Sequence, residues 1–312
     1  MSAESASGNV SIYVRNISIT DYGRSCEGQE SLVWYYVFTV IGGVAIILNI
    51  FVIVAILRKE RKLRWQHKPS LLILSLAFSD LTQGASSLIS HIIILTAPYT
   101  NGTHNLFVIN LHVLYYSIIN GLLHIVSLTL ERFCAIRFPL QYRQKVTIKK
   151  ILMIILGNWL VALTYLVVLL DVDIYKRALS GLIFIIGTSL VIVYTVILLK
   201  VRKVMARRRL NTNTSEKDST FNRQREIRSY VYCLLVMIVF IIFSFPAAVA
   251  EFTNECEYDN TRYVTLLLLT GNAVFNPLLW SFSEWCMVRK KTANQSSDLA
   301  LRTRGVTNEG CI

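Results

Sequence analysis

Long apolar runs are the feature that most restricts how this chain can fold. A helix needs about 20 mostly apolar residues to cross the hydrocarbon core of a bilayer. Seven segments meet this requirement: Leu32–Leu57, Pro69–Ala97, Leu106–Ile136, Ile151–Leu170, Ala178–Leu199, Ser229–Ala250 and Tyr263–Phe282. Only 16% of the residues are charged, whereas soluble domains carry about 25%. The sequence therefore predicts an all-α membrane protein, a seven-transmembrane helix bundle.

The basic residues predict the orientation of this bundle. Of the 32 Lys and Arg residues, 27 fall in or beside the connections 58–68, 137–150 and 200–228 and the tail from Ser283. Because Lys and Arg accumulate on the cytoplasmic side, we expect a multi-pass plasma-membrane protein with an extracellular N-terminus. Topology also explains the net charge of +13, so we expect no nucleic-acid partner.

This orientation divides the chain into three parts. Residues 1–31 form an extracellular N-terminal segment, residues 32–282 the bundle, and residues 283–312 a cytoplasmic membrane-surface helix and tail. The first part lacks an apolar run long enough for a cleavable signal peptide, so we expect the first span to direct insertion. Sequons on the predicted outside predict a glycoprotein; they begin at Asn9, Asn16 and Asn101.

Several polar residues lie inside the predicted spans, where they are costly and often functional. They are Asn49 in the first span, Asp80 in the second, Glu131 and Arg132 at the end of the third, and Asn272 and Asn276 in the seventh. Asparagines also join helices through hydrogen bonds, and an Arg at a helix end can extend to the interface. The residue types alone therefore leave structural roles open.

Several motifs lie in successive spans. The third span ends with ERFCAIRFPLQY at 131–142, and the second contains LAFSD at 76–80. Further landmarks are Trp159, Tyr194, Phe240, Pro246 and the run NPLLW at 276–280. In these motifs and their order, the chain resembles the rhodopsin-like (class A) G-protein-coupled receptors over about residues 32–290. Trp280 departs from the tyrosine that is usual in the family.

The resemblance implies a cell-surface receptor that transmits an extracellular signal to heterotrimeric G proteins by outward movement of the sixth helix. It assigns an activation switch to Glu131, Arg132, Glu226, Phe240, Pro246, Asn276, Pro277 and Trp280. It assigns G-protein contact to Arg132, Pro139 and Leu140. At rest, Arg132 would pair with Glu131 and reach Glu226, which lies about 30 Å along the sixth helix from Pro246. The alternative for Glu226 is a solvated charge in a basic run.

The resemblance also implies a polar network around Asp80, where this family commonly binds Na⁺. Its members are Asn49, Asp80, Asn272 and Asn276. Gly121 replaces the usual third-helix hydroxyl, and Ser244 replaces the usual sixth-helix tryptophan. Because hard cations need several oxygen ligands, we expect a weakened sodium site, with Ser117 or water filling the gap. A protonated Asp80 that hydrogen-bonds Asn276 is the alternative, and we expect no other metal.

A ligand pocket is expected in the outer half of the bundle. Its candidate residues are Leu114, Tyr115, Ser117, Ile118, Glu251 and Thr270. Leu114 stands where amine receptors of this family carry Asp, so we expect no amine ligand. The apolar lining suits a lipid, whereas acidic residues near Glu251 suit a cationic peptide. Thr270 stands where opsins carry the Schiff-base lysine, so we expect no retinal and no other organic cofactor.

The cysteines predict one disulfide and possible lipidation. Cys26 and Cys256 are the only cysteines on the predicted outside, where bridges persist, so we expect them to pair; two free thiols are the alternative. Cys286 and Cys311 are candidates for palmitoylation. We also expect membrane lipids to be partners of the chain.

Three departures point to a subgroup of the family. Phe107 replaces the third-helix cysteine, the second extracellular loop at 171–177 is short, and Ile186 replaces the fifth-helix proline. In these features the chain resembles the group that contains melanocortin, cannabinoid, lysophospholipid and adenosine receptors.

Two other functional classes fit the sequence less well. A transporter or channel would line a path with charges and commonly contains inverted repeats. Here the spans contain one mid-membrane acid, Asp80, and no detectable repeat. Enzyme chemistry has no visible constellation, because the five histidines are scattered without metal-ligand spacing.

Overall fold

The computed structural model describes residues 32–63, 68–96, 100–168, 178, 180–196, 199, 235–236, 238–246, 248–249, 264 and 267–282. Its longer elements are α2 (Leu32–Leu63), α3 (Lys68–Thr96), α4 (Asn101–Arg137), α5 (Pro139–Lys145) and α6 (Ile148–Val168). Shorter helices cover Ser180–Val196, residues 238–246 and Leu267–Phe282. Within this described part, the all-α prediction is confirmed.

Among the described residues, four helices, α2, α3, α4 and α6, are long and apolar enough to cross a membrane. They coincide with the first four predicted spans. The shorter helices fall within the fifth, sixth and seventh predicted spans, although their described parts are shorter than a full span. The chain is therefore a multi-pass helical protein, and the complete set of seven spans stays a prediction.

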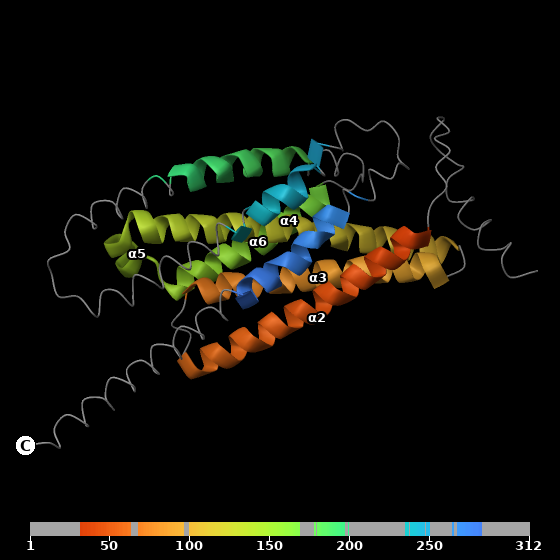
Figure 1. Ribbon diagram of the computed structural model, residues 1–312, viewed down its shortest axis with the longest axis horizontal. Coiled ribbons are helices and arrows are strands. Elements are labelled where there is room, and N and C mark those ends of the chain that lie inside the picture. Colours follow the sequence, from red (N-terminus) through yellow and green to blue (C-terminus); the bar gives the residue numbers. More distant parts are fainter. Residues whose placement is uncertain are drawn as a thin grey trace, which may run out of the picture.

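The helices α2, α3, α4 and α6 form a bundle in which α3 is the most enclosed (Figure 1). Helix α3 packs against α2, α4 and α6, and 56% of its most apolar stretch is buried. The corresponding value for α6 is 11%, since side chains such as Met153 and Leu156 point out of the bundle. Polar groups on α3 can therefore be buried among helices, whereas α6 presents a lipid-facing surface.

Helices α2 and α3 approach each other closely at two glycines. A Cβ atom at Gly42 would lie 2.9 Å from the Gly84 carbonyl oxygen, and one at Gly84 would lie 3.0 Å from the Ala45 Cβ. Membrane helices lack a hydrophobic driving force for association, so small residues that let backbones meet contribute much of the packing. The crossing fixes α2 against the central helix.

Helix α4 begins at Asn101 rather than at the predicted Leu106 because a capping box starts it. The Thr100 hydroxyl accepts from the Thr103 backbone N–H at 3.2 Å, and the Thr103 hydroxyl accepts from the Thr100 N–H at 2.9 Å. These contacts satisfy backbone donors that a helix N-terminus leaves open. The Asn101 sequon therefore lies in a capped first turn, and its glycosylation stays a prediction.

Helix α5 was not anticipated in the connection after α4. Phe138 separates the two helices, and its N–H still donates to the Cys134 carbonyl at 3.0 Å. Pro139 then occupies the first turn of α5, a position that proline tolerates because its missing N–H has no helical partner. This sharp junction places α5 at the end of the bundle where α4 ends and α6 begins (Figure 1).

Candidate functional site

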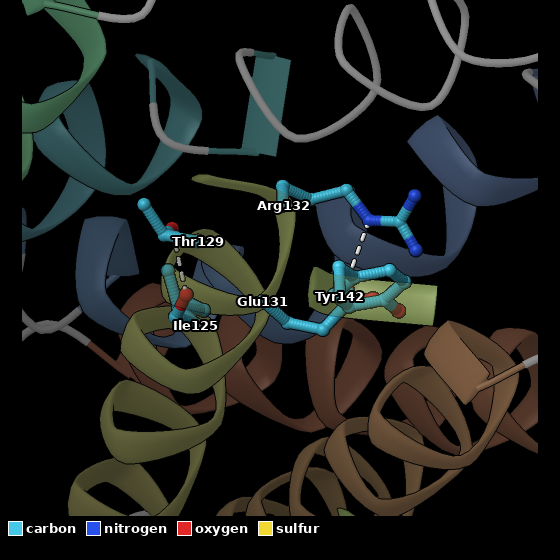
Figure 2. Close-up of polar contacts among 5 residues, drawn as sticks. All are labelled: Ile125, Thr129, Glu131, Arg132 and Tyr142. Carbon is cyan, nitrogen blue, oxygen red and sulfur yellow. Dashed lines mark hydrogen bonds and ion pairs between the residues drawn. The ribbon is translucent and has the colours of Figure 1, made fainter. Parts of the chain in front are cut away.

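A buried ion pair lies near the C-terminal end of α4. Arg132 Nε lies 2.7 Å from Glu131 Oε2, and the side chains are only 12% and 4% exposed. One turn earlier, the buried Thr129 hydroxyl donates to the Ile125 carbonyl at 2.8 Å (Figure 2). Paired charges at low exposure avoid much of the cost of desolvation. The sequence-predicted pairing of Glu131 and Arg132 is thus present in the structure.

Tyr142 from α5 completes this cluster. Its hydroxyl donates to Glu131 Oε1, so the carboxylate contacts Arg132 through one oxygen and Tyr142 through the other (Figure 2). Burial, followed by the effect of the Glu131 carboxylate, raises the pKa of Tyr142. The hydroxyl therefore remains a donor throughout the physiological pH range. Tyr142 was present in the motif, but its role was missed because no spacing rule predicted helix α5.

The Arg132 side chain keeps unused hydrogen-bonding capacity. Its buried Nη2 has no hydrogen-bond partner within the described residues. A buried guanidinium nitrogen without a partner is costly, so this nitrogen is available for a further acceptor. Glu226, the predicted second partner of Arg132, lies outside the described residues, and this half of the predicted latch is untested.

A second polar cluster surrounds Asp80 in the middle of α3. The Asn276 side chain donates to Asp80 Oδ2 at 2.9 Å, and both residues are buried. The bond joins α3 to the Leu267–Phe282 helix across 196 positions of sequence. Because an unpaired polar group is costly when buried, this hydrogen bond favours one relative position of the two helices.

Pro277 explains the position of Asn49. Proline has no N–H, so the Ala273 carbonyl lacks its usual helical donor. The Asn49 side chain supplies one at 2.8 Å and also donates to the Ala45 carbonyl of its own helix. Asn49 therefore joins α2 to the Leu267–Phe282 helix rather than contacting Asp80 directly.

Asn272 forms a hydrogen bond with Ser244 and not with Asp80. Its side-chain nitrogen donates to the Ser244 hydroxyl at 2.7 Å, while its buried oxygen has no hydrogen-bond partner among the described residues. The predicted network thus divides into three linked contacts, and Ser244, noted only as a departure, is one of the partners. The signal in the sequence was a small hydroxyl residue, Ser244, in one predicted span and an amide, Asn272, in the next.

A small cavity connects these polar groups. It offers about 20 Å³, or room for about one water-sized guest. Its polar lining comes from Asp80, Gln83, Ser244, Asn272 and Asn276, and its apolar lining includes Ile118, Leu122, Ile125 and Phe240. Ser117 is not part of this lining, because its hydroxyl donates to the Leu114 carbonyl at 2.7 Å. The expectation that Ser117 or water replaces the missing ligand stays a prediction.

Comparison with known families now bears on these clusters. Residues 48–173 match the family model of the 7 transmembrane receptor (rhodopsin family). The matched segment contains Asp80, the Glu131–Arg132 pair and Tyr142. Comparison with curated proteins found no match. The match supports the rhodopsin-like resemblance and leaves the subgroup open.

The candidate ligand residues do not all lie together in the bundle. Ile118 lines the cavity near Asp80, and Leu114 is buried in the core. The Thr270 hydroxyl donates to the Leu267 carbonyl at 3.1 Å, while Tyr115 packs against the core. Of the candidate residues that the structure describes, the cavity near Asp80 includes Ile118 alone, and the ligand role of the predicted pocket stays a prediction.

The switch residues have contrasting environments. Phe240, Pro277 and Trp280 are buried, whereas Pro246 is exposed. Leu140 on α5 is 74% exposed, as a residue that contacts a partner must be. Pro139 starts α5 beside it.

Sequence reasoning missed a polar junction between α3, α4 and α6. The Trp159 N–H donates to the Ser75 hydroxyl at 2.9 Å, and that hydroxyl lies 2.7 Å from His124 Nε2. His124 Nδ1 lies 2.7 Å from the Asn120 carbonyl, which can only accept, so Nδ1 carries the proton and Nε2 accepts from Ser75. Trp159 was recognised as a landmark, but its partners cannot be read from one sequence.

Several predicted sites lie outside the described residues. They are the glycosylation sites Asn9 and Asn16, the disulfide Cys26–Cys256, the latch residue Glu226, the pocket residue Glu251 and the palmitoylation candidates Cys286 and Cys311.

Proposed function

We propose that this chain is a rhodopsin-like cell-surface receptor that signals to heterotrimeric G proteins. The observation that carries the proposal is the buried Glu131–Arg132 pair at the end of α4, within the segment that matches the receptor family. A receptor needs two states whose balance a ligand can shift. An ion pair with a spare guanidinium nitrogen can hold one state and release Arg132 in the other.

The resting state is held at the predicted cytoplasmic side. Arg132 pairs with Glu131 and, through its remaining nitrogen, with Glu226 of the sixth helix. Outward movement of that helix separates Arg132 from Glu226 and opens a crevice beside the exposed Leu140. In this proposal, the N-terminus is extracellular, seven helices cross the membrane, and residues 283–312 lie on the cytoplasmic surface.

The ligand is a lipid or a peptide rather than an amine. Support comes from the buried, uncharged Leu114 and Ile118 on α4, where a cationic amine would find no carboxylate. The melanocortin, cannabinoid, lysophospholipid and adenosine receptor group remains our proposed neighbourhood. A disulfide between Cys26 and Cys256 would tie the N-terminal segment to the outer loop.

The Asp80 cavity serves as a weak sodium site. Asp80 Oδ2 is used by Asn276, and the third helix contributes Gly121 rather than a hydroxyl at this wall. The buried Asn272 oxygen is one remaining acceptor. Because the third-helix hydroxyl is missing from the oxygen ligands that a hard cation needs, we expect weaker binding than in a complete site.

Basal signalling in cells tests the receptor proposal. Glu226→Ala should raise second-messenger output at equal surface expression, since the latch would lose its acceptor. Arg132→Ala should abolish that output while the protein still reaches the surface. Unchanged basal output in both variants, measured over all major G-protein classes, would argue against G-protein signalling. If Glu226→Ala does raise the output, a screen of lipids and peptides on this variant would identify the ligand.

A further inference from the structure

The corner formed by the end of α4, by α5 and by the start of α6 carries positive charge that no acidic residue in the described part of the chain pairs with. Five cations occupy it, and all are exposed: Arg137, Arg143, Lys145, Lys149 and Lys150. No acidic residue occurs between Arg132 and Leu170. Within the described part of the chain, none of the five forms an ion pair, and Arg137 instead lies over the Phe138 ring at 4.8 Å. We call these five side chains the α5–α6 basic corner.

The start of α6 adds to this positive potential. A helix N-terminus carries a partial positive charge from its open N–H groups. Lys149 and Lys150 lie in the first turn, where acidic side chains are favoured and where α6 has none. The Thr147 hydroxyl caps the Lys150 N–H at 3.3 Å, but a neutral cap does not offset the two lysines. Among the described residues, no acidic side chain therefore balances the positive charge of the corner.

Below the cations, α6 presents an apolar ridge. Residues four and three positions apart lie on one helix face, so Lys149, Met153, Leu156 and Leu160 follow one another along α6. The last three are 72%, 59% and 54% exposed. Because Ile148–Val167 has the composition of a membrane span, this ridge faces acyl chains and Lys149 lies at headgroup level.

We propose that the α5–α6 basic corner binds an anionic phospholipid whose headgroup carries more than one phosphate. The five cations match a multiply charged headgroup better than one with a single net charge, and the ridge accounts for a lipid rather than a soluble anion. The proposal needs only that this end of the bundle faces the cytoplasmic leaflet, where such lipids reside. It does not depend on signalling, so it can fail or succeed separately from the receptor function.

The end of α2 offers a matched comparison. Arg58 and Lys59 also lie at the basic end of a span. They belong to the C-terminal part of α2, where the helix dipole favours cations, and Glu60 follows directly. Their charge is therefore partly compensated within the chain, unlike that of Lys149 and Lys150.

Lipid binding to the purified full chain tests the proposal. Nanodiscs of phosphatidylcholine containing phosphatidylinositol bisphosphate would be compared with discs containing phosphatidylserine at equal total charge. Each cation near a membrane surface contributes about 1 kcal/mol, so Lys149→Gln/Lys150→Gln should weaken binding of the bisphosphate lipid by about tenfold or more. Arg58→Gln/Lys59→Gln should change it less than about threefold.

Three outcomes would overturn the proposal. Equal losses in both pairs would assign the binding to general basic charge. Equal binding of the two lipids would remove the need for several phosphates. Competition by soluble inositol phosphate at the same concentration as the lipid would indicate a site for a free anion. Should the glutamine pair fail to fold, Arg143→Gln/Lys145→Gln on α5 should reproduce the loss, and Lys149→Arg/Lys150→Arg should bind like the wild type.

Discussion

At the scale of single residues, the two clusters depend on a few side chains with strictly defined partners. Glu131 uses one carboxylate oxygen for Arg132 and the other for Tyr142. Asp80 uses one oxygen for Asn276, and Gly121 leaves space beside the other. Both arrangements can be altered by changes of one or two atoms.

Tyr142→Phe removes one hydroxyl and leaves a buried carboxylate oxygen without its donor. The loss of a hydrogen bond to a charged group costs about 1.5–3 kcal/mol, so Glu131 should hold Arg132 less firmly. We expect basal second-messenger output to rise several-fold at equal surface expression. Tyr36→Phe on the exposed face of α2 serves as the control. Output equal to wild type would show that Tyr142 does not help to hold the pair.

Gly121→Ser would supply the missing third-helix hydroxyl. A Cβ at Gly121 would lie 3.6 Å from Ser79 Oγ and 3.7 Å from Asp80 Oδ1, so the serine Cβ would make ordinary van der Waals contacts with both residues. We expect sodium to raise the thermal stability of the variant more than that of the wild type, relative to an impermeant organic cation. Gly121→Ala and Gly121→Ser/Asp80→Asn should lack this gain. A large sodium effect in the wild type that Asp80→Asn removes would contradict the weak-site proposal.

At the scale of helices, the sequence predicted the apolar cores of the elements better than their ends. The Asn101 start of α4 depends on a reciprocal hydrogen bond between two threonines, which an apolar-run criterion does not detect. Helix α5 was missed because its seven residues contain no apolar periodicity long enough to reveal it. In contrast, the resemblance placed Asp80 and Asn276 in one polar network, and the structure contains a hydrogen bond between them.

The close crossing of α2 and α3 can be tested with neighbouring glycines. Gly42→Ala places a Cβ 2.9 Å from a backbone oxygen, whereas a Cβ at Gly43 has no heavy atom within 4 Å. Overpacking of this kind costs about 1–3 kcal/mol. We expect Gly42→Ala to lower thermal stability and surface expression while Gly43→Ala leaves both near wild type. Equal behaviour of the two variants would mean that the crossing is looser than described.

At the scale of the whole molecule, the polar contacts connect helices that are distant in sequence. The Leu267–Phe282 helix forms hydrogen bonds with Asn49, Asp80 and Ser244. A second set of contacts, among Trp159, Ser75 and His124, joins α3, α4 and α6. Sequence reasoning identified most of these residues but did not pair Asn49 with Ala273, Asn272 with Ser244 or Trp159 with Ser75, because hydrogen bonds across 224, 28 and 84 positions leave no local pattern. Buried polar contacts therefore hold the Leu267–Phe282 helix against α2, α3 and the helix at 238–246.

Nucleotide exchange on purified G proteins tests the central claim most directly. The full chain in nanodiscs would be mixed with representative heterotrimers, and GTP-analogue uptake measured for the wild type, Glu226→Ala and Arg132→Ala. If Arg132 is released to engage the G protein, Glu226→Ala should accelerate exchange on at least one heterotrimer above the wild-type rate, and adding Arg132→Ala should return exchange to the rate without receptor. Exchange that remains accelerated after Arg132→Ala, or no acceleration by Glu226→Ala on any heterotrimer, would contradict the account.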